Sequence, residues 1–76
     1  MTTKEILLQY FDEKMLTLFE GGGAYKYDRW VMSTGAFYNN TTIKQRDDIF
    51  KALRANHLHF YEKGRTIYFD VNPSRY

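Results

Sequence analysis

Two histidines separated by one residue are the side chains of this sequence with the clearest potential for chemistry. His57 and His59 form an H-x-H pair, and on a β-strand such spacing places both rings on one face, where they could share a metal ion. A third ligand would have to be Glu62, Asp70 or Asp12. Nothing in the spacing brings any of these carboxylates to the histidines, so we predict no metal site.

Other catalytic arrangements find no support in the residue types. The chain has no cysteine, which excludes thiolate nucleophiles, disulfides and cysteine-based zinc sites. No serine, histidine and carboxylate are spaced as a nucleophilic triad. The glycines at 21–23 lack the preceding strand and the lysine-serine or lysine-threonine pair of a phosphate loop. We therefore expect neither an enzymatic activity nor a bound cofactor.

The length and composition predict one small domain. A chain of 76 residues has too little material for a second core, and its 18% content of aromatic residues supplies large side chains for the first. Charged residues interrupt the opening amphipathic stretch, so we expect no signal peptide, no membrane span and a cytoplasmic protein.

A first helix is predicted over residues 3–20. Thr2 and Glu5 have the spacing of a capping box, in which each side chain satisfies a free backbone N–H at the start of a helix. Apolar residues then recur at helical spacing: Leu7, Phe11, Met15 and Leu18. The glycines at 21–23 would end this helix.

Residues 24–40 fit two interpretations, and the sequence leaves both open. Tyr25 and Tyr27 alternate with charged residues, as in a short strand. Asp28 could instead cap a short helix through Trp30. A third short strand or a helix is therefore expected at 25–32, followed by a turn over 37–40.

A second helix is predicted over residues 42–57. Thr42 and Gln45 repeat the capping-box spacing, and the apolar and charged residues separate onto two faces. The face assigned to the core holds Ile43, Arg46, Phe50, Leu53 and His57, with Ile49 beside them. The opposite face holds Lys44, Asp48, Lys51 and Ala55.

A β-hairpin is predicted over residues 58–71, with Lys63-Gly64 as its two-residue turn. In that register Phe60 faces Ile67, and one side of the hairpin collects the apolar residues: Leu58, Phe60, Ile67 and Phe69. Pro73 ends the pairing and leaves residues 72–76 as a tail. The predicted fold class is thus α+β, with two main helices and a C-terminal hairpin.

The helix and hairpin resemble the recognition helix and wing of winged-helix DNA-binding domains. Phe50, Leu53 and Leu58 have the apolar spacing with which that family leaves its recognition helix, and a Gly-Arg pair followed by an aromatic strand, here residues 64–69, is typical of its wing. The resemblance covers residues 42–71. The family usually has glycine where this chain has His57.

This resemblance implies a small non-enzymatic transcription regulator that binds double-stranded DNA. In the major groove the resemblance implies contacts of Gln45 with an adenine edge and of Lys44 or Lys51 with guanine or phosphate. It also implies a contact of Arg54 with a phosphate, and of Lys63 and Arg65 at the wing tip with the DNA backbone or minor groove. The charge distribution is compatible with this, because residues 41–66 carry six lysines and arginines against three acidic residues.

A second interpretation is a small inhibitor or accessory protein, of the kind that viruses and mobile elements encode, that blocks a larger host protein. Tyrosine and tryptophan are favoured at protein-binding surfaces, and the candidate contacts are Tyr25, Tyr27, Trp30, Tyr38 and Tyr61. The sequence leaves the choice of partner open, and equally the choice between monomer and homodimer.

Overall fold

The computed structural model describes residues 1–21 and 27–73, and within these ranges the protein has an α+β fold, as predicted. The elements in chain order are α1 (Thr3–Leu7), the 3₁₀ turn η1 (Glu13–Met15), β1 (Thr17–Phe19), β2 (Arg29–Ser33), α2 (Thr34–Asn39), α3 (Ile43–Ala55), β3 (Phe60–Lys63) and β4 (Thr66–Asp70). The four strands form one antiparallel sheet in the order β1-β2-β4-β3. No helix in these ranges is long and apolar enough to cross a membrane.

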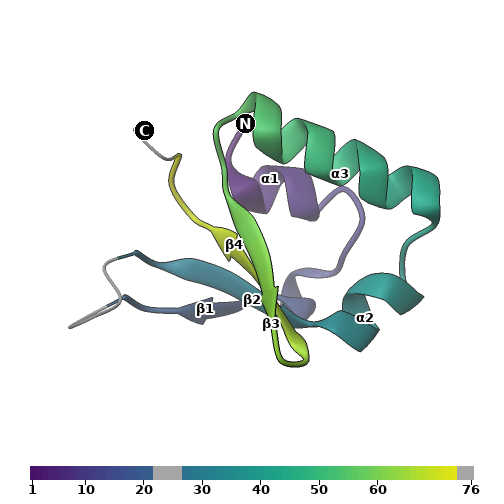
Figure 1. The fold of residues 1–76 in the computed structure, drawn as a ribbon, viewed down its shortest axis with the longest axis horizontal. Helices are drawn as coiled ribbons and strands as arrows, with labels where there is room; N and C mark the ends of the chain where they lie inside the picture. The colour runs from purple at the N-terminus through teal and green to yellow at the C-terminus, as the bar shows by residue number, and fades with distance from the viewer. Residues whose placement is uncertain (22–26, 74–76) are drawn as a thin grey trace.

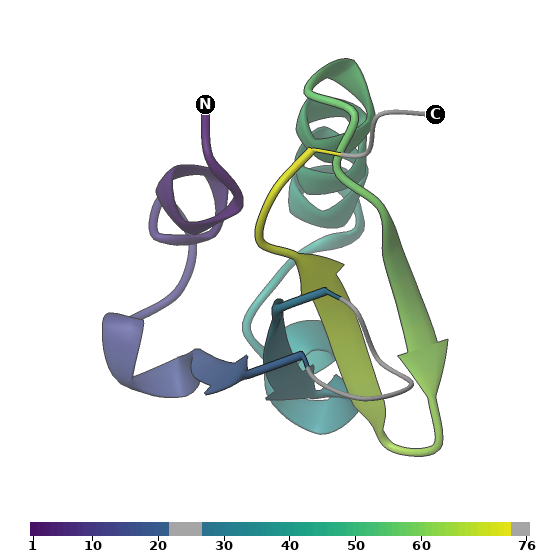
Figure 2. The ribbon, with the colours of Figure 1, turned by 90° about the vertical axis from the view of Figure 1, so that its left-hand side faces the viewer.

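The helices α1 and α3 lie together on one side of the sheet (Figures 1 and 2), and the core fills the space between the helices and the strands. Phe37 of α2 occupies its centre with no exposed surface, and its ring lies 5.6 Å from that of Phe11 and 5.8 Å from that of Phe69. Among the described residues, the other fully buried apolar side chains come from the helices, from the strands and from the segments beside them: Ile6, Leu7, Ile49, Leu53, Leu58 and Ile67.

The predicted helix over 3–20 is wrong, because α1 ends at Leu7. The capping box at its start is present as expected, but Asp12 caps η1 and the chain then extends into β1, which pairs with β2. Phe11 and Leu16 are buried without being part of an α-helix. The apolar spacing identified Leu7 and Phe11 as buried, but Leu18 of the same stripe is 43% exposed. Strand pairing, and not this spacing, decided the backbone conformation.

Within the range 25–32, the residues from Arg29 onward form the strand β2, and the helix α2 follows directly. β2 lies between β1 and β4, and Ser33 at its end accepts a hydrogen bond from the backbone N–H of Ala36 to cap α2. The turn predicted over 37–40 is wrong, because 37–39 are helical and Phe37 belongs to the core. Tyr25 lies outside the described residues.

The helix α3 begins with the predicted capping box between Thr42 and Gln45. Ile43 was assigned to the core face but is 80% exposed. As the first helical residue it lies beyond the core, in which Ile49 and Leu53 are the buried residues of α3, with Phe50 and Ala52 packed against it. The surface at the start of α3 is therefore partly apolar.

The hydrogen bonds that end α3 hold His57 in a left-handed backbone conformation. The N–H of Leu58 donates to the Leu53 carbonyl and that of His57 to the Arg54 carbonyl, which is the hydrogen-bond pattern of a Schellman motif. His57 has a φ of 57°, in the left-handed region that costs a residue with a Cβ atom more than glycine. Glycine would adopt this conformation with less strain than His57 does.

We expect His57→Gly to raise the free energy of unfolding by about 0.5–1 kcal/mol, because glycine adopts the positive φ without the Cβ clash. Urea unfolding followed by circular dichroism measures the change. The matched control is Ala55→Gly in the last helical turn, which should lower stability by about 1 kcal/mol. A loss of stability in His57→Gly would show instead that the imidazole makes a stabilising contact.

The hairpin turn lies one residue later than predicted. Lys63 pairs with Thr66 and Phe60 with Phe69, so Gly64 and Arg65 form the two-residue turn. Gly64 has a φ of 63°, and a glycine at the first central position is what a type II′ turn requires. The shift moves each pairing by two residues, which preserves the faces, and Ile67 and Phe69 are buried as expected.

Candidate functional surfaces

The residues predicted to contact nucleic acid lie in two groups, one on α3 and one at the hairpin tip. Lys44 and Lys51 are exposed on α3, where Asp47 and Asp48 are exposed between them. Lys51 Nζ lies 3.0 Å from an Asp47 carboxylate oxygen, and this hydrogen bond raises the pKa of Lys51. The exposed face of α3 is thus cationic at both ends and acidic at its middle.

Gln45 has a structural role that limits its use in base recognition. Its Oε1 accepts a hydrogen bond of 2.9 Å from the backbone N–H of Thr42. Pairing with an adenine edge uses both the oxygen and the nitrogen of a glutamine amide. Gln45 would therefore have to leave the cap of α3 before it could read a base.

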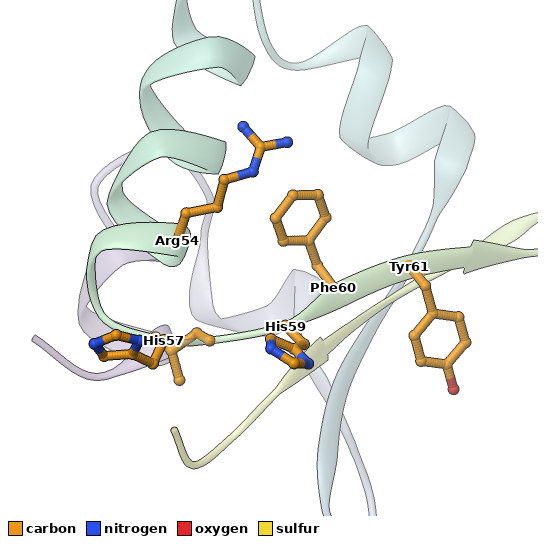
Figure 3. Close-up of a pocket in the computed structure, with 6 residues that line it drawn as sticks. Arg54, His57, His59, Phe60 and Tyr61 are labelled. Atoms are coloured by element: carbon orange, nitrogen blue, oxygen red, sulfur yellow. The ribbon is translucent and has the colours of Figure 1, made fainter. Parts of the chain in front are cut away.

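Arg54 lies over an open hollow between the end of α3 and the start of β3 (Figure 3). Its guanidinium carbon is 5.4 Å from the centre of the Phe60 ring, and that ring stacks in turn on Phe50 at 4.6 Å. In Figure 3 the rings of His57 and His59 do not point at one another. Across the described ranges, no three histidine, aspartate or glutamate side chains are grouped as metal ligands.

The hairpin tip is held against α2. The backbone N–H of Thr34 donates to the Arg65 carbonyl at 2.9 Å, and the Tyr38 hydroxyl donates to the Glu62 carboxylate, which raises the pKa of Tyr38. Lys63 and Arg65 are exposed. The two tip cations therefore belong to a fixed turn beside α2 and are separate from the cations of α3.

The residues predicted to bind protein do not form one surface. Tyr38 lies on α2, and the guanidinium of Arg46 stacks 5.0 Å from its ring. Trp30 packs against the core on the helical side of the sheet, with Lys4 over its ring. Tyr27 and Tyr61 are brought near one another, and the residue between them is Arg29, which the sequence interpretation did not single out.

Arg29 is the centre of a cluster on the sheet face away from the helices. Its guanidinium carbon lies 5.9 Å from the Tyr27 ring centre and 5.4 Å from that of Tyr61, and its Nε lies 3.3 Å from Asp70. We call this cluster the outer-face patch, and its residues are Phe19, Tyr27, Arg29, Tyr61, Tyr68 and Asp70. Successive side chains of a strand point to opposite faces of the sheet. The alternation of apolar and polar residues along β2 and β4 was therefore the sequence signal that could have placed Arg29 and Tyr68 on the face away from the core.

Comparison of the chain with protein-family models, with curated proteins and with solved structures gave no match.

Proposed function

We propose that this protein binds double-stranded DNA through α3, in the manner of a winged-helix regulator. The observation that carries the proposal is the order of elements: β2 leads directly into α2, a three-residue turn joins α2 to α3, and β3 and β4 follow, with β4 between β2 and β3. Two helices joined by a short turn, the second of them exposed, are the arrangement with which helix-turn-helix proteins enter the major groove.

The exposed side of α3 offers both charge and apolar contact to a groove. Lys44 and Lys51 are seven residues apart, which is about two helical turns on the same side of the helix. Ile43, 80% exposed at the start of α3, could meet a thymine methyl group, a contact that apolar side chains make in the major groove. Asp47 pairs with Lys51, so phosphate must compete with this carboxylate for the lysine.

Salt-dependent binding of a short mixed-sequence duplex tests the proposal. For the double variant Lys44→Glu with Lys51→Glu we expect at least roughly tenfold weaker binding at fixed salt, and a log–log salt slope smaller by about 1.8, because each lost phosphate contact removes about 0.9 units. Fluorescence anisotropy over a series of salt concentrations gives both quantities.

The matched control is Lys14→Glu, which reverses an exposed lysine in η1, away from α3. This variant should bind the duplex with nearly the wild-type affinity. Its log–log salt slope should also stay close to that of the wild type, because the reversed charge acts on the DNA only at long range. Equal losses in the control and in the α3 variant would show non-specific attraction to a basic protein. Absence of wild-type binding at near-physiological salt would overturn the proposal.

A further inference from the structure

The outer-face patch lies on the side of the sheet that α1 and α3 leave uncovered (Figure 1). Its aromatic side chains are substantially exposed: 42% for Phe19, 50% for Tyr27 and 38% for Tyr61. Exposed aromatic residues gathered around an arginine have the composition of protein–protein contact centres. The question is which partner the chemistry of the patch fits.

The charge at the centre of the patch is neutralised within the chain. Arg29 and Asp70 form an ion pair in which only 15% and 16% of the two side chains are exposed. A patch with uncompensated positive charge would favour an acidic partner and would repel a second copy of itself. The ion pair of Arg29 and Asp70 neither attracts an acidic partner nor repels a second copy of the chain. Self-association therefore meets no electrostatic barrier at the centre of the patch.

The orientation of the rings disfavours unpaired nucleic-acid bases as the partner. Tyr61 and Tyr68 stack on one another with centroids 4.8 Å apart and planes within 13°, and Phe19 meets Tyr68 edge-on at 6.4 Å. Base binding requires a free aromatic face on which to stack, whereas the Tyr61 ring already stacks on Tyr68 and has the guanidinium of Arg29 5.4 Å from its centre. Figure 3 shows the Tyr61 hydroxyl pointing away from the chain, as suits hydrogen bonding across a protein interface.

We propose that the outer-face patch binds a second copy of this chain in a two-fold symmetric dimer. A two-fold axis places the same patch on both sides of the contact, and a neutral aromatic patch is compatible with itself. A stable interface takes about 800 Å² from each partner, which is roughly one-seventh of the 5319 Å² surface of the described chain. One face of a molecule of this size can supply that area, and burying it would compensate for a small core.

Sedimentation velocity across a dilution series, without DNA, tests the dimer independently of the proposed function. We expect wild type to move between the mass of one 9.1 kDa chain and twice that mass as concentration rises. Tyr61→Glu places two like charges across the two-fold axis. It should therefore raise the protein concentration at which half of the chains are dimeric by at least tenfold. Leu8→Glu, a residue of equal exposure on the helical side, is the matched control and should dimerise as wild type does.

A second measurement covers the case in which Tyr61→Glu does not fold. On dilution of wild type, backbone amide NMR signals of Tyr61 and Tyr68 should shift while those of Ile43 and Leu8 stay constant. A chain that remains monomeric up to millimolar concentration, or whose dilution shifts map to α3, overturns the proposal. A monomer that binds one different protein stoichiometrically through this patch also overturns it, and would favour the protein-inhibitor interpretation.

Discussion

Phe37→Ala is expected to lower the free energy of unfolding by about 3–5 kcal/mol. Phe37 has no exposed surface, and its ring contacts those of Phe11, Phe50 and Phe69 from three different parts of the chain. Removing the ring leaves a cavity that these neighbours cannot all close. A chain of this length has a total stability on the order of 4–11 kcal/mol, so the loss should be a large fraction of the total.

Thermal and urea unfolding, each followed by far-ultraviolet circular dichroism, measure this loss. Phe37→Leu, which keeps most of the apolar volume, should lose about 1–2 kcal/mol. Tyr27→Ala removes an aromatic ring that is half exposed and should cost far less than Phe37→Ala. If the three variants unfold alike, Phe37 is not the centre of the core.

Arg29→Ala is expected to lower the free energy of unfolding by about 2–3 kcal/mol, because removal of one partner of a buried ion pair costs about 3–5 kcal/mol and this pair is only partly buried. The Asp70 side chain, 16% exposed, would be left with little water and no cation. The same change removes the guanidinium from between the rings of Tyr27 and Tyr61. Both effects act on the sheet and leave α3 unchanged.

Two further variants separate these effects in urea unfolding at a fixed low protein concentration. Arg29→Lys keeps the charge but lacks the planar group that stacks on tyrosine, so it should recover only part of the lost stability. The double variant Arg29→Ala with Asp70→Asn should be more stable than the sum of the single changes predicts. Strict additivity would mean that the ion pair contributes nothing.

Local signals explain which parts of the fold the sequence revealed. The two capping boxes depend on residues three apart, so Thr2 with Glu5 and Thr42 with Gln45 could be found without knowing the fold. The length of the first helix could not be found in this way. The segment that was expected to be helical contains β1, and β1 forms by pairing with β2, which begins ten residues after β1 ends. The hairpin turn was missed by one residue, because adjacent two-residue turns both bury Ile67 and Phe69.

The candidate surfaces depended still more on contacts distant in sequence. Lys44 and Lys51 are exposed on α3, as helical periodicity predicted. Arg29 could not be linked to Tyr61 before the strand order was known, since they lie on β2 and β3 with β4 between them. The positive φ of His57 was likewise not predictable from its residue type.

The helix α3 lies on one side of the sheet (Figures 1 and 2), and the residues of the outer-face patch lie on the other side. A dimer joined through the patch would direct its two copies of α3 outward, away from each other. Such a dimer could not grip successive turns of one duplex, as regulators of palindromic operators do. It would tether two separate DNA segments, and its measurable product would be a loop or a paired complex of two duplexes.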